Sequence, residues 1–314
     1  MARAPLVAVV ALLAILLPST AGAVAKGEER VLVVLATNGP RPYSVAEVEA
    51  TVRQADAFFR RASLDQVRLE GDVTPWLAAF RVNPGCGGLT RESFDAVISP
   101  ARSAASLAGF DSSLYDRTVY AIAESRCAFH GETWGRDVML TRQPTLELML
   151  HELGHTLGLG HARSTNCIVA PTRSGCDVEE TGDPFSPMGS GTLDFSAYEK
   201  FVLGWIPPQP NVTKPARYTL ASPAVKTTLP HALVVSTEEG TWWIEYRSIV
   251  RGLIVRLVTE RIGRSPFAEG SVLIANPTRA GRPWVARGES YRIPASFRIT
   301  LERAGQAQAT VRFR

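Results

Sequence analysis

The chain has 314 residues, of which 45% are hydrophobic and 20% are charged, and its formal net charge is +4 at pH 7. This composition is typical of a globular protein with a sizeable core. The small positive charge is not clustered among aromatic residues, so the composition favours no nucleic-acid partner.

The N-terminus predicts a secretory signal peptide. Arg3 precedes an apolar run from Leu6 to Leu17, and small residues ending at Ala23 or Ala25 follow. The run is shorter than the roughly 20 residues of a membrane span. We therefore assign residues 1–25 to the signal peptide and expect a secreted, extracellular or periplasmic protein without a membrane span. Few residues separate the cleavage site from the first predicted strand, so we expect no inhibitory pro-segment.

Strands and helices alternate in the next part of the chain. Residues 30–36 form a continuous apolar run, which predicts a strand buried on both faces. Ser44 and Glu47 have capping-box spacing, and the apolar residues that follow recur at helical intervals through residue 62. The further predicted elements are a strand at 67–73, a helix at 94–107 and a strand at 117–123. The alternation predicts an α/β layer with a partly parallel sheet.

Four cysteines in an exported chain favour two disulfides, for which three pairings are possible. Cys167 and Cys176 flank a short polar loop, which favours a local bond and leaves Cys86 to pair with Cys127. Zinc binding by thiolates is disfavoured because no C-x-x-C spacing occurs. Residues 130–140 predict an edge strand, a type of surface on which an extended peptide can dock.

The clearest chemical signal is H-E-x-x-H-x-x-G-x-x-H, which starts at His151 and contains three of the five histidines. Thr145 is a suitable N-cap for a helix that carries it. His151 and His155 fall on one face of that helix, so both imidazoles can reach one ion. Gly158 can end the helix in a left-handed conformation and bring in His161 as a third ligand. Three protein ligands plus a water is the arrangement of a catalytic zinc site.

Glu152 lies next to the first histidine of the motif, where it can hold a metal-bound water without binding the metal itself. A carboxylate in this position can accept a proton from the attacking water. The plainer alternative is a buried amphipathic helix whose histidines are satisfied by hydrogen bonds. A helix cap, a helix-ending turn and a downstream turn all favour the metal site instead.

The extended motif resembles that of the metzincin metallopeptidases, whose second mark is a turn that contains methionine. Here residues 182–191 carry Met188, with proline and glycine at turn spacing. Within the metzincins, the likeness is to the gametolysin family and its bacterial relatives. It continues through residues 195–205 and more weakly through 243–247, so it covers most of the mature chain, although only the histidine and methionine motifs are specific.

The resemblance implies one catalytic zinc ion bound by His151, His155 and His161, with Glu152 as the general base and Met188 as the floor of the site. Some metzincins carry a tyrosine ligand two residues after the methionine. That position is Ser190 in this chain, so we expect no tyrosine ligand.

The pattern changes after residue 206. Ser196 and Glu199 have capping-box spacing and predict a helix, which the prolines of residues 207–210 end. We therefore expect an α/β (α+β) metzincin-like catalytic domain at 26–206, with a twisted mixed sheet and an active-site helix. Residues 207–314 are expected to form a small all-β, sandwich-like domain. Its predicted strands lie at 232–235, 241–246, 253–258, 271–275, 297–301 and 310–313.

Taken together, these patterns predict a secreted zinc endopeptidase that acts as a monomer on a protein or peptide substrate in extended conformation. One alternative is a surface- or glycan-binding module with a vestigial metal site. Another is a zinc amidase that acts on cell-wall material. Calcium stays undecided, because no loop carries regularly spaced acidic ligands.

Overall fold

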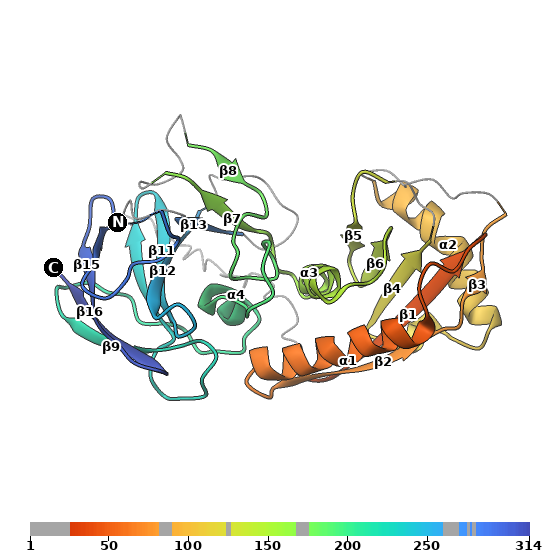
Figure 1. The fold of residues 1–314 in the computed structure, drawn as a ribbon, viewed down its shortest axis with the longest axis horizontal. Coiled ribbons are helices and arrows are strands. Elements are labelled where there is room, and N and C mark those ends of the chain that lie inside the picture. The colour runs from red at the N-terminus through yellow and green to blue at the C-terminus, as the bar shows by residue number, and fades with distance from the viewer. Residues whose placement is uncertain are drawn as a thin grey trace, which may run out of the picture.

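A computed structural model describes residues 26–81, 90–123, 127–167, 176–259, 270–274, 277 and 281–314. In these residues one sheet with three long helices is built from the N-terminal half, and two further sheets are built mainly from the C-terminal half. Figure 1 shows α3 between the two parts. The predicted signal peptide lies outside the described residues.

The N-terminal sheet is mixed, with strand order β2-β1-β4-β6-β5 and β3 also paired with β1. The pairs β1–β2, β1–β3, β1–β4 and β4–β6 are parallel, and only β5 runs antiparallel to its neighbour β6. The mixed α/β class predicted from the alternation of elements is therefore confirmed. The strands are β1 (Gly27–Thr37), β2 (Val67–Val73), β3 (Leu77–Ala78), β4 (Arg117–Ile122), β5 (Gly131–Trp134) and β6 (Asp137–Leu140).

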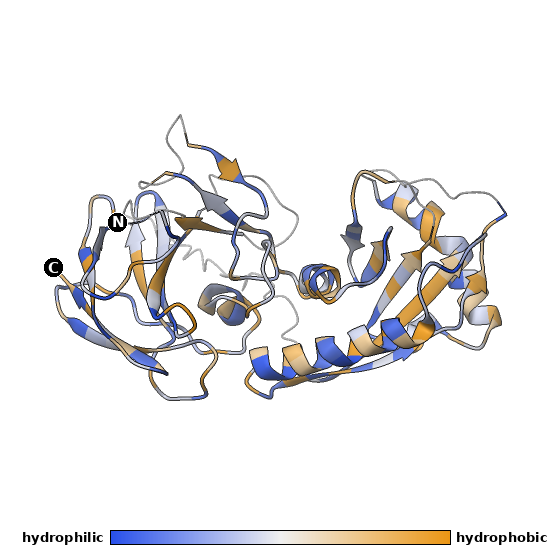
Figure 2. Cartoon of the chain, in the orientation of Figure 1, coloured by the Kyte–Doolittle hydropathy of each residue, from blue (hydrophilic) through white to orange (hydrophobic). Residues whose placement is uncertain are grey.

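Helices cover both faces of this sheet. α1 (Val45–Ala62) and α3 (Leu146–Thr156) share a hydrophobic cluster with one face, and α2 (Arg91–Leu107) packs on the other. A short 3-10 turn, η1 (Ser112–Leu114), follows α2. The capping box of Ser44 and Glu47 is present at the start of α1, as predicted. Figure 2 shows apolar residues concentrated on the central strands and polar residues along one side of α1.

The stretch predicted as a single edge strand at 130–140 is instead a hairpin. Gly135 has a φ of 62° and turns the chain between β5 and β6. β6 then enters the sheet interior beside β4, and β5 takes the edge. The prediction of one strand was wrong because the alternation of apolar and polar residues does not reveal a tight turn of only two residues.

The C-terminal half forms a six-stranded sheet of order β10-β11-β12-β13-β7-β8 and a four-stranded sheet of order β14-β15-β16-β9. One hydrophobic cluster draws residues from both sheets. The strands are β9 (Arg217–Ala221), β10 (Ala232–Thr237), β11 (Gly240–Arg247), β12 (Gly252–Val258), β13 (Ser271–Ile274), β14 (Ser290–Arg292), β15 (Arg298–Ala304) and β16 (Gln308–Phe313). All six predicted strands have counterparts here, whereas β9 and β14 were not predicted.

Two short strands from before residue 207 join the larger C-terminal sheet. β7 (Ala162–Thr165) runs parallel to β13, and β8 (Val178–Glu179) pairs with β7. α4 (Ala197–Val202) begins with the predicted capping box of Ser196 and Glu199 and contacts β11. The two parts of the chain therefore share a sheet across residue 207, and the domain limits remain a prediction.

The helices give no sign of a membrane segment. Within the described ranges, none of them combines the length and the apolar character that crossing a bilayer requires.

Candidate metal centre

α3 carries the first two histidines of the motif. Thr145 caps the helix, and its Oγ1 accepts a hydrogen bond from the backbone N–H of Leu148. The apolar side of the helix is buried in the core through Met149, Leu150 and Leu153. Since His151 and His155 are four residues apart, this anchoring holds both imidazoles over the same side of the helix.

Gly158 follows the end of α3 and has a φ of 92°, in the left-handed region that favours glycine. The chain turns back there, and the carbonyl of Leu159 comes within 2.8 Å of Nδ1 of His155. His161 then returns toward the helix, immediately before β7. The left-handed turn thus brings the third histidine to the other two.

The three imidazoles converge. The ring centroids of His151, His155 and His161 are 4.8 to 5.2 Å apart, and one nitrogen from each ring lies within 4.8 Å of the others. Nε2 of His155 is 3.2 Å from Nε2 of His151. Among the described residues, no further His, Cys, Asp or Glu joins this group. Three imidazole donors without a fourth protein ligand fit a zinc ion that keeps one open position.

Each imidazole is oriented by a hydrogen bond from its other nitrogen. Nδ1 of His151 lies 2.8 Å from the carbonyl oxygen of Pro187, and Nδ1 of His161 lies 2.8 Å from Oε1 of Glu180. The carbonyl of Leu159 holds His155 at the same distance. Because every one of these partners is an acceptor, the protons are assigned to Nδ1. With its proton on Nδ1, each ring can present Nε2 to a metal.

Burial also favours the neutral, metal-binding form of two histidines. It lowers the pKa of His151 to about 4, although the hydrogen bond to Pro187 opposes this shift. Burial and the neighbouring His151 together lower the pKa of His155 to about 3. Both imidazoles are therefore uncharged at neutral pH, as metal ligands must be.

The carboxylate of Glu152 packs against β5. Its side chain is buried, and Oε2 accepts a 2.6 Å hydrogen bond from Oγ1 of Thr133. A Cβ at Gly131 would collide with the carboxylate, so this glycine makes room for it. Burial raises the pKa of Glu152 to about 7; the Thr133 hydrogen bond opposes the shift, and nearby Glu132 adds to it.

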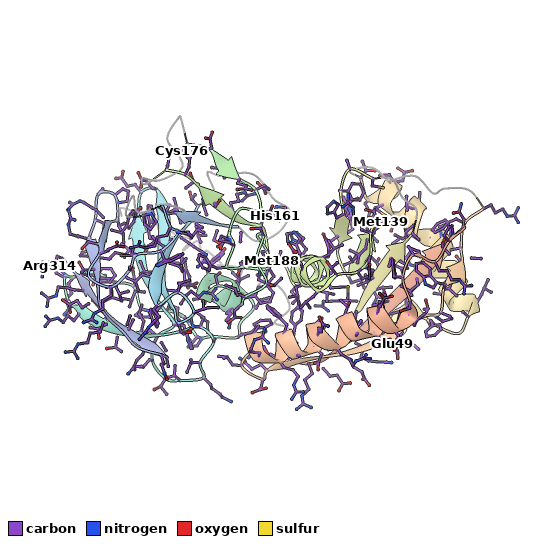
Figure 3. The ribbon with its side chains drawn as sticks, in the orientation of Figure 1. Glu49, Met139, His161, Cys176, Met188 and Arg314 are labelled. Carbon is purple, nitrogen blue, oxygen red and sulfur yellow. A yellow bond between two sulfur atoms is a disulfide. The ribbon has the colours of Figure 1, made fainter. Side chains whose placement is uncertain are left out.

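The Met188 turn, residues 182–191, packs directly under α3. The side chain of Met188 is fully buried, and a Cβ at Gly154 would collide with its Sδ. The backbone N–H of Met188 donates to Oγ of Ser186, and its carbonyl accepts from Ala162, the residue after His161. Figure 3 shows Met188 and His161 on the side of α3 that faces the C-terminal sheets.

One of the two predicted disulfides joins the chain just after β7 to the chain just before β8. Cys167 and Cys176 are bonded, with their Cα atoms 5.5 Å apart, and they follow and precede the paired strands β7 and β8. Cys127 is also disulfide-bonded. Its predicted partner, Cys86, lies outside the described residues. Glu180 lies just after β8, four residues beyond Cys176.

Several residues that shape the site were not predicted. Thr133 and Gly131 contact the carboxylate of Glu152, and Gly154 leaves room for the side chain of Met188. Glu180 orients His161. Only Gly154 could have been noticed from the sequence around it. A glycine in the middle of a helix destabilises the helix, so its presence suggests that another residue packs closely against that position. Glu180 has no such signal, because it follows another glutamate in a polar loop.

Glu180→Gln is expected to weaken zinc binding by about 10- to 100-fold, the range typical of partners that orient a metal ligand. Glu180 is held by Arg163, with Nε of the arginine 2.7 Å from Oε2. The amide keeps the shape but loses the charge that strengthens the hydrogen bond from His161. Competition with a zinc-binding dye measures the change in zinc affinity. Glu179→Gln, the exposed neighbour, is the control, and equal affinities for both variants would contradict the prediction.

Comparisons with known proteins give a short and distant likeness. No protein-family model matches the chain. The chain is 35% identical over 68 residues to archaemetzincin from Sulfolobus acidocaldarius, which is 22% of this chain and 37% of that protein. The match therefore spans little more than a third of the curated relative.

Solved structures add little to this likeness. The crystal structure of archaemetzincin from Methanopyrus kandleri aligns with 56% of this chain and 94% of its own, at 17% identity and a TM-score of 0.32. A chaperone–substrate complex aligns with 56% of this chain and 30% of its own, at 16% identity and a TM-score of 0.34. Scores this low do not establish a shared fold. The sequence match supports a distant relationship to a metallopeptidase family and does not single out the gametolysin family.

Proposed function

We propose that this protein is a secreted zinc endopeptidase of the metzincin type, with His151, His155 and His161 as ligands and Glu152 as the general base. One observation carries the proposal. One nitrogen from each of three imidazoles lies within 4.8 Å of the others, and each Nδ1 faces a hydrogen-bond acceptor. A buried carboxylate belongs to the residue that follows the first ligand on the same helix.

The residues of the site have different roles in the proposed hydrolysis. A zinc ion bound here would polarise the substrate carbonyl and make a water molecule more acidic. Glu152 accepts the proton of that water and passes it to the leaving amine. Thr133 holds the carboxylate in place, and the buried surroundings keep its proton affinity close to what transfer at neutral pH requires.

An extended polypeptide suits the surface beside this carboxylate. β5 is the last strand of its sheet in the described part of the chain, so its outer edge is unpaired there. Gly131 of β5 touches the side chain of Glu152. A peptide that adds to this edge would pass close to the general base, and backbone hydrogen bonds would hold it without regard to sequence.

Peptide cleavage with and without metal tests the proposal. The full chain is incubated with a casein digest or an unstructured peptide library, first with added zinc and then with a chelator, and the products are identified by mass spectrometry. We expect internal cleavage that stops with the chelator and returns with zinc. Tight binding to glycan without cleavage, or release of cell-wall amide products alone, would replace the endopeptidase with one of the two alternatives.

Thr133→Val is expected to move the acid limb of kcat/KM to higher pH by about one unit, since a hydrogen bond to a charged group contributes roughly 1.5–3 kcal/mol. Glu152 acts as a base only when ionised, so activity falls as pH drops through its pKa. Burial places that pKa at about 7 without metal, and the charge of zinc lowers it. The pH profiles of both proteins measure the shift.

Thr118→Val is the matched control for this shift. Thr118 is fully buried in β4 of the same sheet, and among the described residues its hydroxyl has no hydrogen-bond partner. We expect its pH profile to match the wild type. An acid limb that stays in place in Thr133→Val would show that Thr133 does not tune the base.

A further inference from the structure

A group of buried charges joins the C-terminal sheet to the Met188 turn. Arg256 of β12 is 1% exposed, and its Nε lies 2.7 Å from Oδ2 of Asp183, which is fully buried in the turn. Nη1 of the same arginine lies 2.6 Å from Oε1 of Glu245 on β11. One arginine from the C-terminal sheet therefore bridges a carboxylate of its own sheet and a carboxylate of the turn.

Asp183 in turn fixes the backbone of the Met188 turn. Its Oδ1 accepts a 2.8 Å hydrogen bond from the N–H of Phe185, and its own carbonyl accepts one from Ser190. Its N–H donates to the carbonyl of Ala162. The carboxylate held by Arg256 thus fixes the first limb of the turn, and the backbone carbonyl of the same residue holds the second limb.

The turn connects directly to two of the three histidines. The carbonyl of Pro187 accepts the hydrogen bond that orients His151. The carbonyl of Met188 accepts from Ala162, the residue that follows His161. A shift of the turn would therefore move one imidazole through its hydrogen bond and another through the backbone.

Glu245 provides a second connection to the same turn. It accepts hydrogen bonds from Arg247 and from the backbone N–H of Ala197 at the start of α4, both at 2.6 Å. Burial opposes its ionisation, yet Arg247 and Arg256 lower the pKa of Glu245 to about 2. α4 then carries Glu199, whose carboxylate accepts from Ser186 in the turn.

We infer that Arg256 is a positioning residue for the metal centre, acting through Asp183 on the Met188 turn. Stability alone does not explain such a group, because replacing a buried ion pair with apolar residues of similar volume is often neutral or stabilising. Fixed geometry does explain it, since the arginine fork holds two carboxylates in set directions. The inference rests on the proposed metal site and makes the C-terminal sheet part of that site.

Three single variants of the full chain test this role. Arg256→Met removes the charge, and Arg256→Lys keeps it but loses the fork. Arg117→Met is the matched control, because Arg117 is a largely buried arginine of the N-terminal sheet that pairs with Glu29 at 2.6 Å. Zinc affinity is measured by dye competition, the ligand geometry by the absorption spectrum of the cobalt(II) form, and the unfolding midpoint without metal by thermal denaturation.

We expect Arg256→Met to weaken zinc binding at least tenfold and to change the cobalt spectrum, with a smaller effect in Arg256→Lys. Arg117→Met should lower the unfolding midpoint without changing either metal property. If Arg256→Met does not fold, Arg256→Lys carries the test. Wild-type affinity and an unchanged spectrum in both Arg256 variants would overturn the inference.

These measurements do not depend on turnover. A wild-type protein that binds zinc but cleaves no peptide would refute the proposed peptidase function, and the effect of Arg256 on zinc binding would still be measurable. An active wild-type protein with unaffected Arg256 variants would refute the positioning role alone.

Discussion

Glu152→Gln should lower kcat for peptide hydrolysis by about 10²- to 10⁴-fold, the usual contribution of a general base, while zinc affinity stays near the wild-type value. The amide has the same shape, so it still fits beside Gly131 and accepts from Thr133. It cannot take a proton from water. Steady-state kinetics and dye competition on the same preparations separate the loss of proton transfer from any loss of metal.

Glu132→Gln is the control for this substitution. Glu132 lies on β5 near the general base, and its Oε1 accepts a hydrogen bond from Nε1 of Trp134. Its charge contributes to the raised pKa of Glu152, so its removal should lower the acid limb of the pH profile slightly and leave kcat nearly unchanged. Substantial residual activity in Glu152→Gln would remove Glu152 from its role.

His161→Ala should weaken zinc binding by more than about 100-fold, beyond the range seen for partners that only orient a ligand. The two remaining histidines of α3 cannot complete a three-ligand site. At zinc concentrations about 100 times the wild-type Kd, binding stabilises the folded protein by about 2.7 kcal/mol. This gain should almost disappear in the variant. Urea unfolding with and without zinc measures it.

The same substitution at His130 serves as the control. His130 is exposed and precedes β5, and it takes no part in the histidine cluster. His130→Ala should keep the full zinc-dependent stabilisation. The side chain of His161 is 31% exposed, so its loss costs the metal-free protein little stability. Equal zinc effects in both variants would exclude His161 as a ligand.

Most helices and strands could be predicted because their signals are local. The capping boxes of α1 and α4 and the threonine cap of α3 are each contained within four residues, and all three are present. Elements whose existence depends on a distant partner could not be predicted. β7 is a four-residue strand that forms by pairing with β13, more than a hundred residues later in the chain.

The sequence by itself determined that three imidazoles and a carboxylate share one helix and the turn after it. Helical spacing places His151 beside His155, and a left-handed glycine returns the chain, both over a few residues. Only the tertiary structure decided what holds these groups. The hydrogen bond between Pro187 and His151 joins residues that are 36 positions apart in the sequence. The bond from Thr133 to Glu152 spans 19 residues, and the bond from Arg256 to Asp183 spans 73 residues. Such contacts follow from how the sheets pack around α3, and no pattern of neighbouring residues encodes them.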